Sequence, residues 1–598
     1  MEVTVKNPRK QRCLKLEVDH LVNNVKPRSF EPKIAWHKAS PENLATYANV
    51  LKQELASLYF PYSALMCHNI LCKDASHNTA LSEYITDVSN CCMRAAKLTL
   101  PVTSPRAARG HIPGWSADVE PKRRQSLFWH GIWVDCGRPR SGHIADIMRK
   151  TRLAYHYAIR IARRQESDIV NQRFADAILG NKSRDFWGEV KRIRCSGSSC
   201  SSCVDGRTCS KDVADLFAKQ YQDLYTSVPY VQADMARIYE EIEGSITAYD
   251  NSCLVTVPEV IDAVYKLKPG KSDGYMGLSS DYFLNACSDL FLHISLLFSS
   301  LLVHSCVPEV MALSTVIPIP KGKHCNISSS ANYRGILLIS MFNKLFDLIL
   351  LSRYSDELCS CDPQFGFKPK RSTDMCTMIL KKSVSYYVNN NTSVYCTFLD
   401  ASKAFDRVEY SKLFRLLMKR KLPAIVLRML CNMYVNHRAR VQWNGVCSTV
   451  FAVLNGVKQG GIISPIMFCV YIDDLPLLLV KSEVGCFIGN WFVGVLAYAD
   501  DIVLLAPSAP AMRAMLHRCD TFAEQFNVIF NVSKSRCMFS HQRAVIHIHI
   551  HIHVVFTANL HYTSMEVLLN MLRSGCILDM LFQVIWIISQ TYLEDAVH

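Results

Sequence analysis

Two short apolar stretches joined by an acidic turn constrain the fold more than any other segment of this chain. Residues 493–497 and 502–506 favour β-strands, and Tyr498-Ala499-Asp500-Asp501 separates them, which predicts an antiparallel hairpin. Two adjacent carboxylates repel by about 4 kcal/mol at about 4 Å and an effective dielectric near 20, so the turn favours a bound cation. A divalent metal suits such oxygen ligands. The same tetrapeptide is also typical of a solvated surface turn.

The composition indicates a globular protein with a polyanionic partner. The chain has 598 residues, of which 49% are hydrophobic and 10% aromatic, so it has room for several domains and global disorder is excluded. Its 67 Lys and Arg exceed its 52 Asp and Glu, which gives a net charge of +15. This balance favours nucleic acid over a membrane surface as the partner.

No segment has the pattern of a signal peptide or a membrane span. Residues 1–10 lack an apolar core, and residues 576–589 are too short to span a bilayer and include Asp579. We therefore expect an intracellular protein, in the nucleus, the cytoplasm or both, whose 25 cysteines are reduced thiols. Two tracts leave metal binding open against a simpler interpretation, a Ser/Gly-rich loop with Cys195, Cys200, Cys203 and Cys209 and a low-complexity Ile/His run with His547, His549, His551 and His553.

The first 245 residues divide into two regions by composition. Residues 1–110 are predicted to be a helical, linker-like region, in which Ser40 caps a helix that begins at Pro41. Residues 111–245 are predicted to be a basic, helical region of an RNA-binding kind. Within it, residues 122–164 contain 11 Lys or Arg against two Asp, with interleaved aromatic residues such as Trp133 and Tyr155. This mixture suits unpaired nucleic acid, but a solvated basic helix face with buried aromatics would look the same.

From about residue 255 helical and strand-like runs alternate, which predicts an α+β fold. Residues 290–303 read as a helix and residues 314–320 as a strand. Residues 394–399 form another β-prone run, and Asp400 follows it directly. If that strand pairs with the acidic hairpin, three carboxylates meet and can hold two metal ions about 3.5–4 Å apart. Asp406 is expected to cap the helix that follows.

A glycine-rich segment lies between the two acidic sites. Residues 455–468 include Gln459, Gly460 and Gly461, where a backbone without side chains can approach a ligand closely. Ser464-Pro465 is expected to open an apolar helix. Taken alone, the segment is an ordinary glycine-rich turn.

The strand that ends at Asp400, the glycine-rich segment at 455–468 and the acidic hairpin follow one another in this order along the chain. In this order they resemble the reverse transcriptases of non-LTR (LINE-like) retrotransposons. The resemblance extends over about residues 255–540, with a weaker match over about 110–245. Further matching segments are residues 267–274, 316–321, 332–336, 364–367 and 531–535.

The resemblance implies a right-hand polymerase, with fingers and palm in residues 246–540. Its antiparallel palm sheet would carry Asp400, Asp500 and Asp501 as ligands of two Mg²⁺ ions, for which Mn²⁺ can substitute. Phe405 would lie under the incoming sugar and obstruct a 2′-hydroxyl. The remaining implied site residues are Lys321 and Arg334 on the triphosphate, Gln459 and Gly460 lining the nucleotide and template pocket, and Lys534 as proton donor to pyrophosphate or as a solvated lysine.

The implied activity is RNA-directed DNA synthesis, in which dNTPs are added to the 3′-hydroxyl of a DNA primer on an RNA template. Protein partners are not predicted. The sequence departs from the family pattern in three places. Residues 1–110 lack an endonuclease constellation, Met276 stands where the family tends to have a polar residue, and an Ile/His repeat and a degenerate tail at 541–598 stand where a thumb is expected. The alternative hypothesis is therefore an inactive, truncated relic that only binds RNA. An RNA polymerase with a similar palm is disfavoured by Phe405.

Overall fold

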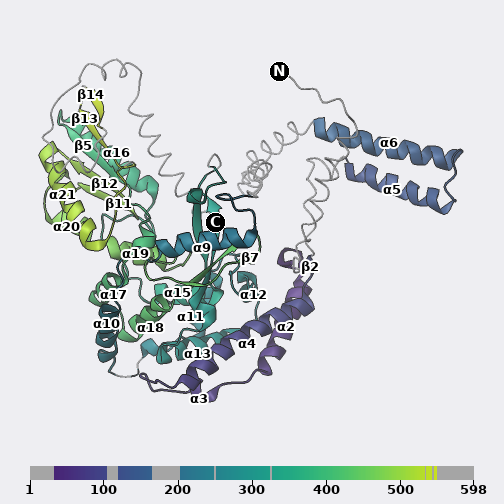
Figure 1. The fold of residues 1–598 in the computed structure, drawn as a ribbon, viewed down its shortest axis with the longest axis horizontal. Helices are drawn as coiled ribbons and strands as arrows, with labels where there is room; N and C mark the ends of the chain where they lie inside the picture. The colour runs from purple at the N-terminus through teal and green to yellow at the C-terminus, as the bar shows by residue number, and fades with distance from the viewer. Residues whose placement is uncertain are drawn as a thin grey trace. The chain divides into compact units, whose positions relative to one another are not determined.

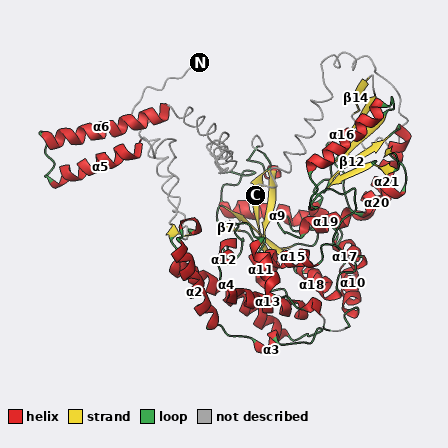
Figure 2. Cartoon of the chain, turned by 180° about the vertical axis from the view of Figure 1, so that it is seen from behind, coloured by secondary structure: helices red, strands yellow, loops and turns green. Residues whose placement is uncertain are grey.

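The computed structural model describes residues 33–103, 119–164, 203–247, 249, 251–322, 326–532, 534–541 and 544–548. The described residues belong to two compact units (Figures 1 and 2). Of the described residues, those at 33–35, 102–103 and 119–164 belong to the first unit, and those at 36–101 and from 203 onward belong to the second. The predicted domain boundaries at 110, 245 and 540 remain predictions.

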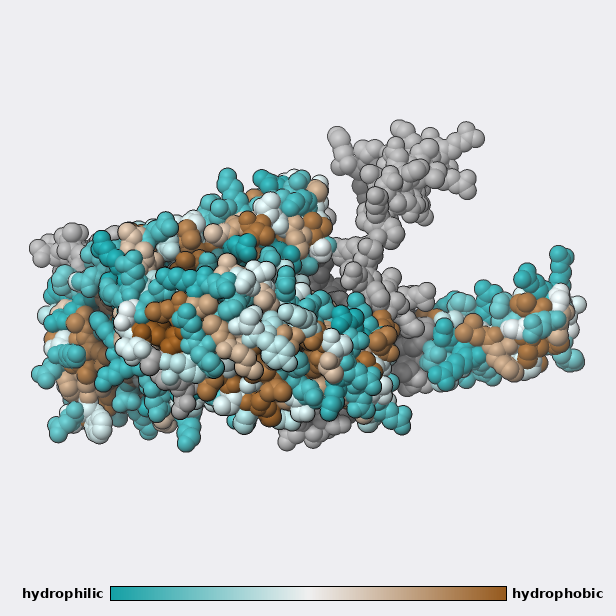
Figure 3. Space-filling view, turned by 90° about the horizontal axis from the view of Figure 1, so that it is seen from below, coloured by the Kyte–Doolittle hydropathy of each residue, from teal (hydrophilic) through white to brown (hydrophobic). Residues whose placement is uncertain are grey.

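The first unit is built around a pair of helices. Strand β1 (Lys33–Ile34) pairs with β2 (Val102–Thr103), and α5 (Glu120–Asp135) packs along α6 (His143–Arg164) (Figure 1). Apolar side chains lie among hydrophilic ones on this helical pair (Figure 3). Phe128 and Tyr157 are exposed, whereas Tyr155 and Ile159 are half-buried. Exposed rings beside many cations are compatible with the nucleic-acid interpretation of residues 122–164.

The second unit begins with helices α2 (Pro41–Ala56), α3 (Tyr62–Leu65) and α4 (Ala75–Thr99), which makes its N-terminal part mainly helical. The predicted cap at Ser40 is confirmed, because its hydroxyl oxygen accepts a hydrogen bond from the Asn43 N–H. In return, the Ser40 N–H donates to Asn43 Oδ1. Helix α4 lies against α2 and against α13 (Ser288–His304) (Figure 1). Residues 36–101 therefore share a core with the rest of this unit.

The remaining helices surround two sheets. The helix predicted at 290–303 is confirmed as α13, and the one predicted to open at Ser464-Pro465 is confirmed as α19. Helix α19 spans Ser464–Ile472. The other helices are α9 (Ser210–Leu224), α10 (Gln232–Gly244), α11 (Val257–Tyr265), α12 (Ser280–Leu284), α14 (Glu309–Ala312), α15 (Met341–Arg353), α16 (Thr373–Asn389), α17 (Tyr410–Lys419), α18 (Ala424–Val435), α20 (Asp474–Lys481) and α21 (Ala509–Phe526). Short 3₁₀ turns lie at η1 (Trp36–Lys38), η3 (Asn251–Cys253), η4 (Ser330–Asn332) and η5 (Phe405–Arg407).

One sheet has five antiparallel strands in the order β11-β12-β5-β13-β14. Their bounds are β11 (Val495–Tyr498), β12 (Asp501–Ala506), β5 (Val394–Leu399), β13 (Arg536–His541) and β14 (Ala544–Ile548). Alternate side chains of β5 serve opposite faces: Cys396 packs in the cluster that includes Leu380 of α16, and the Thr397 hydroxyl contacts Met512 of α21. Figure 2 shows these strands beside α16 and α21. The predicted antiparallel sheet is thereby confirmed.

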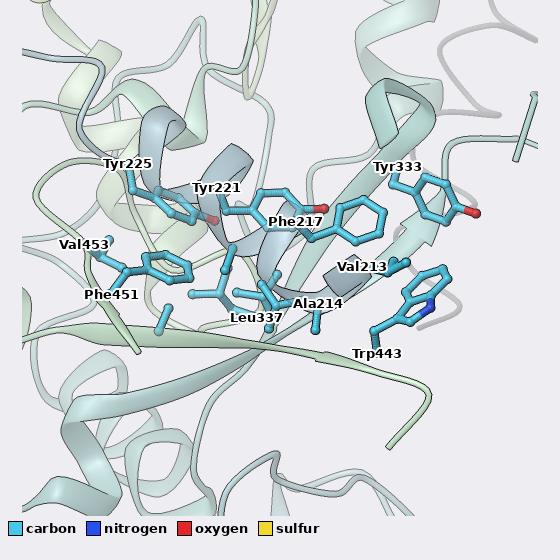
Figure 4. Close-up of a cluster of buried hydrophobic side chains, with 14 of the residues drawn as sticks. Val213, Ala214, Phe217, Tyr221, Tyr225, Tyr333, Leu337, Trp443, Phe451 and Val453 are labelled. Atoms are coloured by element: carbon cyan, nitrogen blue, oxygen red, sulfur yellow. The ribbon is translucent and has the colours of Figure 1, made fainter. Parts of the chain in front are cut away.

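The second sheet has the order β4-β3-β6-β7, with β8 also paired to β6. It comprises β3 (Leu313–Pro320), which confirms the strand predicted at 314–320, β4 (Tyr333–Leu338), β6 (Arg438–Trp443), β7 (Val446–Cys447) and β8 (Phe451–Ala452). A further hairpin joins β9 (Phe487–Ile488) to β10 (Trp491–Phe492). Helix α9 covers the second sheet through Phe217, whose ring centroid lies 5.1 Å from that of Tyr333 and 5.3 Å from that of Trp443 (Figure 4).

Helices and sheets are thus mixed throughout the second unit, so the predicted α+β class is confirmed. Within the described part of the chain, no helix combines the length and the apolar character that crossing a membrane requires.

Candidate active site

The pairing of β5 with β12 brings the three predicted carboxylates to one end of the sheet. Ile502 pairs with Leu399 in the last pair of this ladder, and Asp501 and Asp400 are the residues that follow at this end of the two strands. Asp500 lies in the turn of the β11–β12 hairpin, and all three aspartates are partly exposed. The pairing expected between the acidic hairpin and the strand before Asp400 is confirmed.

A buried glutamine fixes the shape of the acidic turn. Ala499 has a φ of 56°, in the left-handed region, so the turn needs support from outside. Gln364 is fully buried; its Oε1 accepts hydrogen bonds from the N–H groups of Ala499 at 2.8 Å and Gly366 at 2.9 Å, and its Nε2 donates to the Ala499 carbonyl at 3.3 Å. A Cβ on Gly366 would lie 2.5 Å from the Ala499 nitrogen. The segment around Gln364 therefore clamps the turn that carries Asp500.

Sequence reasoning missed this role of Gln364. In the sequence, residues 364–367 stand out only as one of the segments that resemble the family. The signal that could have found the role is the pattern of an amide two residues before a glycine in a chain with a strained acidic turn. That pattern does not say which turn the amide reaches, because the two segments are more than a hundred residues apart.

Asp400 is held through its backbone while one of its carboxylate oxygens accepts no hydrogen bond. Its N–H donates to the Ser535 hydroxyl at 3.2 Å, and its carbonyl accepts from the Asn531 N–H at 2.7 Å. Its Oδ2 is shielded from solvent and has no hydrogen-bond partner, although the exposed Lys534 ammonium lies 3.5 Å away. A buried carboxylate oxygen without a donor is costly, and a divalent cation would satisfy it. The donor set at this position therefore fits a metal ligand.

Phe405 and Asp406 lie in η5, beside the glycine-rich segment. The ring of Phe405 stacks on that of Phe468 with centroids 4.6 Å apart and planes 15° apart. Gln459 Nε2 donates to Asp406 Oδ1 at 2.6 Å, and Asp406 is only 6% exposed. Burial raises the pKa of Asp406 to about 7, although Lys403, Gln459 and Arg334 oppose the rise. Gln459 is thus positioned by a buried carboxyl.

The expectation that Asp406 caps the following helix is wrong. The N-cap of α17 is Glu409, and Asp406 stands three residues earlier in a 3₁₀ turn. The turn directs its side chain to Gln459, away from the N–H groups at the start of α17. Sequence spacing alone did not reveal that extra turn.

The remaining predicted site residues lie around the β3–β4 hairpin. Gly460 has a φ of 121°, and a Cβ there would lie 2.2 Å from the Leu337 carbonyl oxygen, so the glycine lets this loop press against β4. Arg334 is exposed on β4 and close enough to Asp406 to influence its pKa. Lys321 follows β3, and its ammonium donates to the Ala331 carbonyl at 2.8 Å. Arg334 therefore lies near Asp406, the partner of Gln459, whereas Lys321 contacts the backbone of its own hairpin.

The Asp406→Asn variant should change how stability depends on pH. In the unfolded chain this carboxyl ionises near its ordinary pKa of 3.8, and in the folded chain at about 7, so the folded state binds more protons between these values. Wild-type stability therefore falls as pH rises through that window, by about 2–4 kcal/mol from this group alone. Asn keeps an acceptor for Gln459 but cannot ionise. Chemical unfolding at pH 5 and pH 8 should show the variant gaining on the wild type at the higher pH; an equal difference at both values would contradict the account.

Two tracts left open for metal binding fall largely outside the described residues. The described residues do not include Cys195, Cys200, His549, His551 or His553. Cys203 and Cys209 are described, and His547 lies in β14, where only the backbone is described. Both interpretations of each tract therefore remain predictions.

Comparison with known proteins identifies the region that carries this site. Residues 319–567 match the family described as "Reverse transcriptase (RNA-dependent DNA polymerase)". These residues are a reverse transcriptase domain. All of the predicted metal ligands, Asp400, Asp500 and Asp501, lie inside it, and such a domain implies a polymerase that depends on a divalent metal and acts on a nucleic-acid template and primer.

The relatives that match this chain come from mobile elements. It is 24% identical over 404 residues to the "RNA-directed DNA polymerase from mobile element jockey" of Drosophila funebris, covering 64% of this chain and 43% of that protein. It is 28% identical over 236 residues to the "Retrovirus-related Pol polyprotein from type-2 retrotransposable element R2DM" of Drosophila melanogaster, covering 38% of this chain and 21% of that one. The resemblance to non-LTR retrotransposon reverse transcriptases is confirmed, and the chain spans less than half the length of these relatives.

Among solved structures, apo telomerase from Candida tropicalis aligns with 84% of this chain and 87% of its own, at 10% identity and a TM-score of 0.33.

Proposed function

We propose that this chain is the polymerase part of a non-LTR retrotransposon protein and catalyses RNA-directed DNA synthesis. The observation that carries the proposal is the pairing of β5 with β12, which brings Asp400 and Asp501 to the same end of the sheet, inside residues that match a reverse transcriptase family. The substrates would be dNTPs, the 3′-hydroxyl of a DNA primer and an RNA template. The cell nucleus or cytoplasm is the expected compartment.

Asp400, Asp500 and Asp501 would hold two Mg²⁺ ions, with Mn²⁺ as a substitute. When bound, such a pair makes the primer hydroxyl more acidic and neutralises charge on the α-phosphate and the departing pyrophosphate. The aspartates supply the oxygen ligands, and the Gln364 clamp keeps Asp500 in place while they do so. Lys534, 3.5 Å from Asp400, would offset the negative charge of the trio and would donate a proton to a leaving pyrophosphate.

Other residues of the domain would position the nucleotide. Phe405, stacked on Phe468, presents a rigid ring that can lie under the sugar and exclude a 2′-hydroxyl. Gln459, fixed by Asp406, and Gly460 would line the pocket for the base and the template. Arg334 and Lys321 would bind the triphosphate, where an Arg can make paired, charge-assisted hydrogen bonds.

Primer extension on a homopolymer RNA template tests the proposal. The purified chain, given an oligo(dT) primer on poly(rA) with dTTP and Mg²⁺ or Mn²⁺, should extend the primer, and a chelator should stop the reaction. The alternative, a relic that only binds RNA, predicts a folded protein that retains RNA but incorporates nothing under any of these conditions. That result would overturn the proposed activity.

The basic helical pair in α5 and α6 should contribute to RNA binding. Arg149, Lys150 and Arg152 are exposed on α6 and are not needed for its core. Reversing their charges should reduce the slope of log K against log salt by about 0.7–0.9 for each RNA phosphate that these side chains neutralise in the wild type. Filter binding of a single-stranded RNA at several salt concentrations measures that slope. An unchanged slope would place the RNA path elsewhere.

A further inference from the structure

Four metal-ligating side chains meet at a place far along the chain from the polymerase carboxylates. Cys67 and Cys72 lie in the loop between α3 and α4, His77 lies in the first turn of α4, and His304 is the last residue of α13. One ligand atom from each of the four lies within 4.8 Å of the others. The set joins two parts of the second unit that are more than two hundred residues apart in sequence.

His304 points an unpartnered nitrogen into this cluster. The residue is 6% exposed, and its Nε2 is 3.0 Å from the Ala64 carbonyl oxygen, to which it can only donate a proton. Its Nδ1 is then an unprotonated acceptor, and this buried atom has no hydrogen-bond partner. A histidine with one nitrogen held by a carbonyl and the other left open has the form of a metal ligand.

His77 shows the same division between its two nitrogens. Its Nδ1 lies 3.6 Å from the Cys72 sulfur, and its Nε2 lies 3.8 Å from a carboxylate oxygen of Asp74. A carboxylate behind a histidine orients the ring and increases its basicity toward a metal. The two imidazole rings pack edge to face with centroids 5.0 Å apart. Each ring is therefore held from the outside by an oxygen.

The spacing of the ligand atoms is close to that of a tetrahedral zinc site. Zn–S bonds of about 2.3 Å and Zn–N bonds of about 2.0–2.1 Å place tetrahedral ligand atoms about 3.3–3.8 Å apart. The Cys72 to His77 distance of 3.6 Å already falls in that range, and the remaining separations are at most 4.8 Å. A small contraction would complete the coordination shell.

The end of α13 that carries His304 is fixed independently of the cluster. Arg428 is 2% exposed, and its Nη2 donates to the Leu302 carbonyl at 3.3 Å and the Val303 carbonyl at 2.8 Å. Ser305 follows in the left-handed conformation, and Asn432 donates to its carbonyl at 3.0 Å. Helix α18 therefore fixes the position of His304 independently of the loop that carries the two cysteines.

We propose that Cys67, Cys72, His77 and His304 bind one structural Zn²⁺ ion that fastens the α3–α4 loop to the end of α13. Two sulfurs and two imidazole nitrogens in a tetrahedron favour zinc over magnesium or calcium. Four protein ligands close the coordination sphere, so the ion has a structural role. Binding would release the protons of the two thiols and tie residues 36–101 to the helices of the polymerase. The proposal does not depend on polymerase activity.

Metal analysis of the full chain tests the site. Protein purified under reducing conditions and reconstituted with Zn²⁺ should lose about one equivalent of zinc on Cys72→Ser or on His304→Gln, relative to wild type. The exposed Cys359, outside the cluster, provides the matched control, and Cys359→Ser should keep the wild-type zinc content. A zinc content that is the same in wild type, Cys72→Ser and His304→Gln would overturn the proposal.

A measurement on the wild type covers the case in which these variants do not fold. Zinc should protect Cys67 and Cys72 from alkylation, as read by peptide mass spectrometry, and a chelator should expose both. Replacement of zinc by Co²⁺ should give the visible absorption of a tetrahedral site with thiolate ligands. Equal alkylation with and without chelator, or a Cys67–Cys72 disulfide in the reduced protein, would contradict the assignment.

Discussion

Primer extension by Asp500→Asn should fall at least about 10³-fold below wild type. The substitution replaces a charged oxygen ligand by a neutral amide of the same shape, and the stabilisation of phosphoryl transfer by bound metal is several kcal/mol. Gln364 contacts the turn through the backbone of Ala499, so the clamp survives the change. The loss should therefore appear in the rate of incorporation while RNA binding and the midpoint of unfolding remain near wild type.

Asp223→Asn is the matched control for this variant. Asp223 is an exposed aspartate of α9, and its replacement removes the same charge without touching the β5–β12 edge. It should extend primers at the wild-type rate. If Asp500→Asn and Asp223→Asn were equally active, the acidic hairpin would not be the catalytic centre.

Gln364→Met should lower primer extension by about 10–10²-fold and the free energy of unfolding by about 2–4 kcal/mol. Methionine matches the size of glutamine but can neither accept from the N–H groups of Ala499 and Gly366 nor donate to the Ala499 carbonyl. Each buried polar group left without a partner costs about 1–3 kcal/mol. Release of a turn with a left-handed Ala499 would also displace Asp500, and a shift of about 1 Å at a reacting centre can cost about 10²-fold in rate.

The exposed Gln222 of α9 supplies the control for the loss of an amide. Gln222→Met should leave both the rate and the unfolding free energy close to wild type. Steady-state extension and chemical unfolding of the two variants give the comparison. A Gln364→Met protein with wild-type extension would show that the clamp is dispensable for the site.

The local elements of this chain could be predicted because their signals lie within a few residues. The strand before Asp400 and the hairpin around Asp500 are short β-prone runs with clear ends, and the Ser40 cap is a local hydrogen-bonding pattern. Their pairing was implied by the resemblance to reverse transcriptases, whose antiparallel palm sheet would carry all three aspartates. The site of the three carboxylates was therefore accessible from sequence.

Contacts between distant segments were not accessible in the same way. The side chain of Gln364 forms a hydrogen bond with Ala499, and that of Gln459 with Asp406. No rule based on sequence spacing predicts such hydrogen bonds between distant residues. The 3₁₀ turn at η5 places the Asp406 side chain beside Gln459. The expectation that Asp406 caps the next helix was therefore wrong. The Cys67 and His304 cluster was missed for the same reason, because its last ligand arrives from α13.

Anomalous scattering from Mn²⁺ would test the central claim most directly. Crystals of the full chain with an RNA template, a DNA primer and a non-hydrolysable dNTP should show two anomalous peaks about 3.5–4 Å apart, bound by the carboxylates of Asp400 and Asp500 with Asp501 beside them. Manganese peaks located elsewhere, with no ion near these aspartates in a complex that holds primer and nucleotide, would contradict the account.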